Sequence, residues 1–241
     1  MRHEHVYRQK PINAKVIFRI KYPGLTSRRF RVKARNDIKA MDKILKEDFY
    51  AGTTPEIAKK LLGKRLCRRT DAGLCVGKIV ETEAYVGKED LACHSAKGRT
   101  ARTEAMFGPA GHAYVYLVYG MYHCLNIVTQ EAGAPEAVLI RALEPLMLEN
   151  EKITPEQKLY RGKRIGKILD GPGKLCRKFG IRREMNGALL AKKNGLWLEE
   201  GEDIPPRRIV AAPRVGVDYA KEWKDKPLRF YIKNNNFISR K

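Results

Sequence analysis

Residues 113–128 read AYVYLVYGMYHCLNIV, and this stretch indicates the fold class. Two runs rich in β-branched and aromatic residues meet at Tyr119-Gly120-Met121, which predicts a β-hairpin with Gly120 at its turn. Hairpin tips usually carry Asn, Asp, Gly or Ser. Tyrosine and methionine are costly to expose to water, so this tip either enters an apolar slot such as a base stack or folds back into the core. The spacing leaves both alternatives open.

The chain around this hairpin predicts one α+β domain with a curved, mainly antiparallel sheet flanked by helices. Strands are expected at residues 76–86, 113–118, 122–129, 137–143, 207–217 and 228–233. Helices are expected from Met41 to about Phe49, from Thr53 or Thr54 to Gly63, at 154–169 and at 173–179. The domain is expected to cover residues 41–241, preceded by a basic extension at 1–40.

The composition excludes a disordered polycation, because 43% of the 241 residues are hydrophobic although the net charge is +22. Residues 1–40 contain 12 Lys and Arg against two acidic residues, a net charge of 12 − 2 = +10. Such a charge favours an anionic partner, of which nucleic acid is the commonest. The extension could be a nucleic-acid-binding arm, an organelle-targeting segment or a start-site artefact.

Several other classes of protein are excluded by what the sequence lacks. No run of 18 apolar residues predicts a membrane span, and the N-terminus has no apolar signal-peptide core. Five scattered cysteines without a CxxC pair indicate a reducing compartment. The five histidines do not have zinc-site spacing, so neither a metal site nor a cofactor is expected.

Two carboxylates on the predicted strand 76–86 are the first candidates for chemistry. On a strand, Glu81, Glu83 and Tyr85 share one face, and Thr82 belongs to the other. A carboxylate beside an aromatic ring, in the middle of a cationic domain, is a reasonable general base. The alternative is a solvated acidic face of the sheet.

A glycine-rich turn precedes the helix expected at 173–179. Backbone N–H groups of Gly171 and Gly173, together with Lys174, suit a phosphate at a helix N-terminus. The stretch is not a Walker A loop, because its spacing is wrong and Leu175 replaces Ser or Thr. A simple turn is the alternative.

Taken together, these segments resemble one enzyme family. The motifs that carry the resemblance occur in order: VETEAY (80–85), CHS (93–95), YVYLVYGMY (114–122), RALEP (141–145), GPGKLC (171–176), RVGV (214–217) and EWKDKPLRFY (222–231). The chain strongly resembles the alkyladenine (3-methyladenine) DNA glycosylase family over about residues 42–235. Residues 1–40 lie outside the resemblance.

The resemblance implies a monofunctional DNA glycosylase that excises alkylated or deaminated purines from double-stranded DNA. Water would attack C1′ of a nucleotide flipped out of the helix, because a stacked base cannot be reached. By match to the family's motif, Glu83 would activate that water, and Arg141 would help to hold Glu83 and the water. No lysine lies within the pocket motifs, so we expect an intact abasic site without strand cleavage.

The same resemblance implies roles for the remaining site residues. Tyr85, His94 and Tyr116 would enclose the extruded base, and Asn126 would clash with the 2-amino group of guanine. Val215 would offer a backbone carbonyl near the attacking water. Tyr119 would fill the gap in the duplex, with Met121 and Tyr122 beside it. We expect a monomer that acts inside the cell with its DNA, in a bacterial cytoplasm or nucleoid or in a eukaryotic nucleus or organelle.

Two rival functions remain open on the residues alone. A non-catalytic nucleic-acid-binding protein would use the same basic surface and stacking tyrosines. A metal-dependent nuclease would need an acidic cluster, for which Glu81 and Glu83 are the close candidates. The sequence does not distinguish between 3-methyladenine, 7-methylguanine, hypoxanthine and etheno adducts as the preferred lesion.

Overall fold

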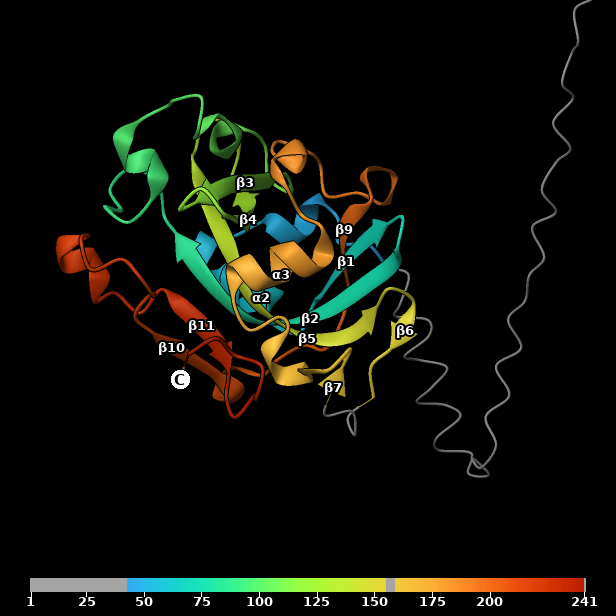
Figure 1. Cartoon of the computed structure of the whole chain (residues 1–241). Coiled ribbons are helices and arrows are strands. Elements are labelled where there is room, and N and C mark those ends of the chain that lie inside the picture. Colours follow the sequence, from blue (N-terminus) through green and yellow to red (C-terminus); the bar gives the residue numbers. More distant parts are fainter. Residues whose placement is uncertain (1–42, 155–158, 241) are drawn as a thin grey trace, which may run out of the picture. The chain divides into compact units, whose positions relative to one another are not determined.

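The computed structural model describes residues 43–154 and 159–240, and the predicted basic extension lies outside them. One curled antiparallel sheet of nine strands forms the centre of the domain, which confirms the predicted α+β class (Figure 1). Its main path runs β10-β11-β2-β5-β4-β3, while β1 pairs with β2 and β9, and β6 pairs with β5. The strands are β1 (Arg65–Thr70), β2 (Gly73–Tyr85), β3 (Ala113–Val118), β4 (Tyr122–Thr129), β5 (Glu136–Leu148), β6 (Glu151–Lys152), β9 (Leu196–Glu199), β10 (Ile209–Ala212) and β11 (Arg229–Ile232).

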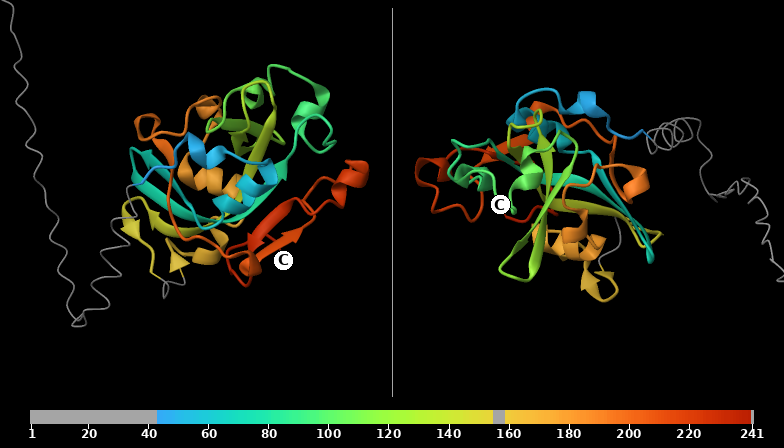
Figure 2. Two further views of the ribbon diagram at one scale, coloured as in Figure 1. Left: turned by 180° about the vertical axis from the view of Figure 1, so that it is seen from behind. Right: turned by 90° about the horizontal axis from the view of Figure 1, so that it is seen from above.

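Two α-helices flank the sheet, α2 (Thr54–Leu61) and α3 (Pro172–Phe179). α2 packs against β2 and β5, and α3 packs against β4 and β5, so both helices lie beside the curled sheet (Figure 2). Thr53 is the N-cap of α2, because its backbone N–H donates to the Glu56 carboxylate at 2.9 Å. Short 3-10 helices occupy the connections: η1 (Glu47–Tyr50), η2 (His94–Lys97), η3 (Glu104–Phe107), η4 (Ile165–Lys167), η5 (Arg183–Met185), η6 (Lys192–Asn194), η7 (Pro206–Arg208) and η8 (Lys221–Lys224).

A large hydrophobic cluster joins both helices to the sheet. From α2 it receives Ile57 and Leu61, and from α3 it receives Leu175 and Phe179, all fully buried. Burying each such side chain stabilises the fold by about 1.5–3 kcal/mol. The five cysteines are free thiols and all are buried. The packed sheet therefore forms a rigid scaffold, and the loops of the site are attached to it.

The hairpin predicted at residues 113–128 is formed by β3 and β4. Tyr119 and Gly120 both have positive φ, of 51° and 67°, and the N–H of Met121 donates to the carbonyl of Val118 at 3.1 Å. This twist suits the turn between antiparallel strands. The tip does not fold back into the core, because Tyr119 is 88% exposed and Met121 is 68% exposed.

Two predicted helices are wrong where the structure describes them. Residues 43–46 are extended, because Leu45 donates to the carbonyl of Leu198 at 3.0 Å and the backbone pairs beside β9; only η1 follows. In place of the helix at 154–169, β7 (Leu159–Tyr160) and β8 (Lys163–Arg164) form a small hairpin before η4. Its turn residues Arg161 and Gly162 have φ of 47° and 75°, which a helix cannot accommodate.

The strand predicted at 207–217 is shorter, because β10 ends before Pro213, which has no N–H for a sheet ladder. The chain then leaves the sheet and brings Val215 to the side chain of Glu83. The helix predicted at 173–179 is confirmed as α3.

Candidate active site

The two carboxylates of β2 lie inside the domain. The register of β2 against β5 shifts on both sides of Glu81, which marks a β-bulge. Thr82 points to α2, where its hydroxyl donates to the carbonyl of Ala58 at 2.9 Å. Glu81 and Glu83, on the opposite face, have no exposed surface. The alternative of a solvated acidic face is therefore wrong.

Glu83 is held by three groups that the sequence had marked separately. Its Oε2 accepts a hydrogen bond from the Tyr85 hydroxyl at 2.9 Å, and its Oε1 accepts one from the backbone N–H of Val215 at 2.8 Å. Nη1 of Arg141 lies 3.3 Å from Oε1. Residues from β2, β5 and the loop after β10 thus converge on one buried carboxylate.

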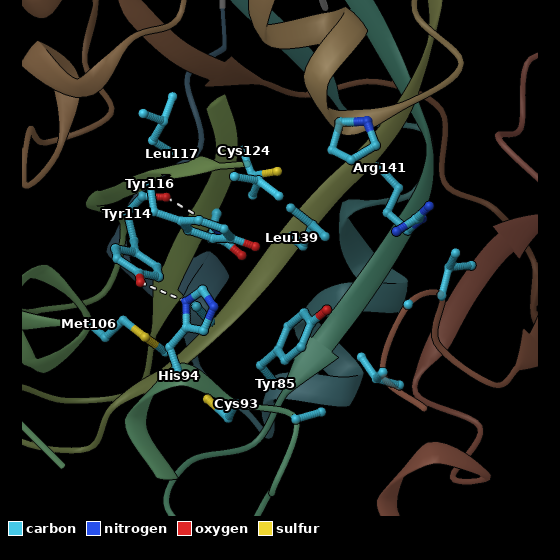
Figure 3. Close-up of a pocket in the computed structure, with 18 of the residues that line it drawn as sticks. Tyr85, Cys93, His94, Met106, Tyr114, Tyr116, Leu117, Cys124, Leu139 and Arg141 are labelled. Carbon is cyan, nitrogen blue, oxygen red and sulfur yellow. Dashed lines mark hydrogen bonds between the residues drawn. The ribbon is translucent and has the colours of Figure 1, made fainter. Parts of the chain in front are cut away.

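A cavity of about 430 Å³ opens beside this carboxylate. Its size suits a purine base. Among its lining residues are Tyr85, His94, Tyr116, Tyr119, Asn126, Arg141 and Val215. Figure 3 shows Tyr85 facing His94 and Tyr116 across this space, with Arg141 at one side. Glu83 itself has no exposed surface, but its three contacts with Tyr85, Arg141 and Val215 place it directly behind the wall.

Tyr114 is a site residue for which the sequence analysis predicted no role. Its hydroxyl pairs with Nδ1 of His94 at 2.8 Å, and its carbonyl accepts from Nδ2 of Asn126 at 3.1 Å. The ring of His94 lies edge-on to that of Tyr116, with 4.4 Å between the centroids. Tyr114 fixes two residues of the pocket. The available signal was its position two residues before Tyr116, on the same face of β3.

Electrostatics keep the aromatic groups of the cavity uncharged. Burial, together with the nearby cations Arg102 and Lys97, lowers the pKa of His94 to about 4, so the imidazole is neutral at pH 7. Burial and the adjacent carboxylate of Glu83 raise the pKa of Tyr85 well above its usual value. Tyr85 therefore stays protonated and donates its hydroxyl hydrogen to Glu83.

A buried ion pair fixes the loop that carries Val215. Arg214 forms a two-pronged pair with Asp90, one bond of which is 2.7 Å long, and it also donates to the carbonyl of Ala84 at 2.9 Å. Its guanidinium lies 4.8 Å from the ring centroid of Tyr85. Burial opposes the charge of Arg214, but Asp90 outweighs it and the pKa of Arg214 is raised. The sequence analysis did not select Asp90.

The glycine-rich turn before α3 has packing and pairing partners. A side-chain carbon added at Gly173 would lie 3.0 Å from the ring of Tyr122, so this glycine lets the hairpin approach α3 closely. Lys174 pairs with Asp170 at 2.7 Å. Phosphate binding by Gly171, Gly173 and Lys174 remains a prediction.

The described part of the chain places no lysine in the cavity wall, whose cations are Arg102 and Arg141. No helix within residues 43–154 and 159–240 is long and apolar enough to cross a membrane.

Comparisons with known proteins agree on one family. The family model described as methylpurine-DNA glycosylase (MPG) matches residues 48–236. A relative from Methanocella arvoryzae, named as a 3-methyladenine DNA glycosylase, is 49% identical over 82% of this chain and 96% of its own length. A relative from Myxococcus xanthus with the same name is 45% identical over 81% of this chain and 93% of its own length. A relative from Encephalitozoon cuniculi, named as a DNA-3-methyladenine glycosylase, is 48% identical over 76% of this chain and 87% of its own length.

Proposed function

Since the chain belongs to the methylpurine-DNA glycosylase family, we propose that it removes alkylated and deaminated purines with a water activated by Glu83. The enzyme is a hydrolase of the DNA-3-methyladenine glycosylase type, which cleaves N-glycosidic bonds in DNA and begins base excision repair. The observation that carries the proposal is the buried carboxylate of Glu83, held against the wall of a base-sized cavity.

In the proposed reaction, Glu83 takes a proton from a water that lies where Tyr85, Arg141 and Val215 meet. The water oxygen forms a bond to C1′, and the bond from C1′ to the purine nitrogen breaks with its electrons going to the base. General-base help of this kind contributes about 10²–10⁴ in rate. The ionised carboxylate also stabilises the positive charge that develops on the sugar. The predicted contact of the Val215 carbonyl with the water is kept as part of this proposal.

The aromatic walls favour a cationic leaving group. A purine alkylated at N3 or N7 carries positive charge, and rings such as Tyr85 and Tyr116 attract it by about 0.5–2 kcal/mol each. His94 adds no opposing charge, because its lowered pKa leaves it neutral. Asn126 lies in the same wall, where it would reject the 2-amino group of guanine.

The exposed hairpin tip is proposed to fill the gap that the extruded nucleotide leaves in double-stranded DNA. Tyr119 enters the stack, with Met121 and Tyr122 beside it, and stacking of about 1–3 kcal/mol offsets part of the cost of extrusion. The exposure of Tyr119 supports this role, because the ring is free to contact bases. We propose that one chain suffices and that it acts where the cell keeps its DNA.

The function is tested by single-turnover release of bases from duplex oligonucleotides that carry 3-methyladenine, 7-methylguanine, hypoxanthine or 1,N6-ethenoadenine. We expect wild type to release at least the alkylated bases and to leave an intact abasic site, and Glu83→Gln to release none. Release by Glu83→Gln at the wild-type rate would exclude the water mechanism. A covalent adduct trapped by borohydride would show that an amine attacks the sugar instead.

A further inference from the structure

The segment that follows β11, residues 235–240, is fastened to the sheet on the side of Glu81. Nδ2 of Asn235 donates to Glu144 at 3.1 Å, and its Oδ1 accepts from the N–H of Phe237 at 2.8 Å. Nη1 of Arg229, on β11, donates to the carbonyl of Arg240 at 3.0 Å. Phe237 and Ile238 pack against the hydrophobic core. These contacts fix the position of Ser239 between them.

Ser239 contacts both charged partners that surround the active-site carboxylate. Its backbone N–H donates to Oε2 of Glu81 at 2.6 Å, and its hydroxyl oxygen accepts from Nη2 of Arg141 at 3.2 Å. Glu81 also accepts from Arg229 at 2.9 Å, which neutralises its charge. Ser239 thus binds both the carboxylate of Glu81 and the guanidinium of Arg141.

Arg141 needs such a fixed point because it lies between two buried carboxylates. Its Nε is 3.4 Å from Glu81, and its Nη1 is 3.3 Å from Glu83. A guanidinium is planar, so fixing Nη2 on one side sets the direction of Nη1 on the other. Without the Ser239 hydroxyl, Nη2 loses this hydrogen bond, and the contacts with the two carboxylates are left to orient the guanidinium.

We propose that Ser239 is a positioning residue that directs Arg141 towards Glu83 and so holds the carboxylate in place. Ser239 touches neither the cavity nor the reacting atoms and acts through Arg141 alone. The family model matches residues 48–236, so Ser239 lies beyond the matched part of the chain. The inference rests on the proposed function, in which Glu83 activates the water.

The test compares Ser239→Ala, which removes the hydroxyl but keeps the backbone N–H, with Ser239→Thr, which keeps both. Ile238→Val is the matched control, because Ile238 packs in the same segment and makes no polar contact with Arg141. In single-turnover release from a 7-methylguanine duplex, we expect Ser239→Ala to lose about tenfold at pH 7. Ser239→Thr and Ile238→Val are expected to keep most of the rate.

Two further readouts separate positioning from simple loss of structure. The acid limb of the pH–rate profile should move to higher pH in Ser239→Ala, because a misdirected Arg141 stabilises the ionised carboxylate less. In an Arg141→Gln background, Ser239→Ala should add no further loss, since its only route to Glu83 is gone. Should alanine prevent folding, Ser239→Cys replaces the acceptor oxygen by a larger and only weakly accepting sulfur, and the same loss of rate is expected.

A wild-type rate in Ser239→Ala, or an equal loss with and without Arg141, would overturn the inference. If Glu83→Gln still lacks activity in the same assay, the proposed function stands and only the role of Ser239 fails. If Glu83→Gln is active, the proposed function itself fails.

Discussion

Glu81 and Glu83 lie two residues apart on β2, both fully buried and both beside Arg141, but their surroundings differ. Glu83 is bound by Tyr85 and Val215, whose other surfaces line the cavity. Glu81, on the same face of β2, is bound by Arg229 and Ser239 in the closed interior of the protein. Burial is thus the same for both. What distinguishes the candidate catalytic carboxylate is that its partners border open space.

The different partners of Glu81 and Glu83 also imply different energetic roles for the two carboxylates. A buried carboxylate is tolerated only when charges and hydrogen bonds compensate its lost hydration. Glu81 is compensated by groups that hold the sheet together, so its removal should act on folding. Glu83 is compensated by groups of the cavity wall, so its removal should act on chemistry. The experiments below test this division of roles.

The largest effect is expected from Glu83→Gln. The amide keeps the size of the side chain; its oxygen can accept from the N–H of Val215 and its NH2 can donate to the Tyr85 hydroxyl, but it cannot take a proton from water. Single-turnover base release should fall by about 10³-fold or more, while binding to lesion DNA is retained. Circular dichroism melting provides the folding control. A loss of less than tenfold would mean that Glu83 is not the general base.

Glu81→Gln should have the opposite effect: it should lower the stability of the fold more than the rate of base release. Removing one charge leaves Arg229 facing a neutral amide inside the protein, and breaking a buried pair costs about 3 kcal/mol of unfolding free energy. Denaturant titration measures that loss. Glu202→Gln is the control, because its pair with Arg208 is half exposed and worth at most about 1 kcal/mol. If the rate of base release per folded molecule falls as much in Glu81→Gln as in Glu83→Gln, the assignment of Glu81 to folding and Glu83 to chemistry is wrong.

Tyr119→Ala extends the comparison to the mouth of the cavity. The ring is almost fully exposed, so the free energy of unfolding should change by less than about 0.5 kcal/mol. Residence on lesion DNA should shorten by about 10- to 100-fold, in line with the lost stacking. Stopped-flow dissociation measures this. Unchanged residence and normal release would show that the tip does not enter DNA.

The smallest effect concerns His94 and acid stability. Its folded pKa of about 4 lies below the usual 6.5, so the unfolded chain binds the proton more readily. The stability that neutral His94 provides is present above pH 6.5 and is lost as the pH falls towards 4. Wild type should lose about 1–2 kcal/mol more than His94→Gln between pH 7 and pH 5. His123→Gln, which removes a histidine outside the cavity lining, is the matched control.

Local patterns gave the parts of the fold that depend on neighbouring residues. The hairpin around Gly120, the capping box at Thr53 and helix α3 were all predictable from short stretches. Residues 43–46 and β9 were not, because distant backbone partners decide their conformation. The helix predicted at 154–169 was wrong, because the turn at Arg161 and Gly162 has positive φ angles that a helix cannot accommodate.

The site was predictable to the extent that its residues stand in recognisable motifs. Glu83, Arg141 and Val215 come from three distant segments that the structure brings into contact, while their roles in the reaction stay predictions. Asp90 and Ser239 were missed, because their importance lies in partners on other elements, which no local spacing reveals. Burial of both carboxylates was equally invisible, because distant segments cover them: Arg229 and Ser239 bind Glu81, and Val215 binds Glu83.

The most direct test of the account is a crystal structure of Glu83→Gln bound to a duplex that contains 1,N6-ethenoadenine. We predict that the intact nucleotide lies in the cavity between Tyr85 and the pair His94 and Tyr116, with C1′ next to the side chain of residue 83 and Tyr119 in the gap. A lesion that remains stacked in the duplex, or a bound base separated from residue 83 by protein, would contradict the account.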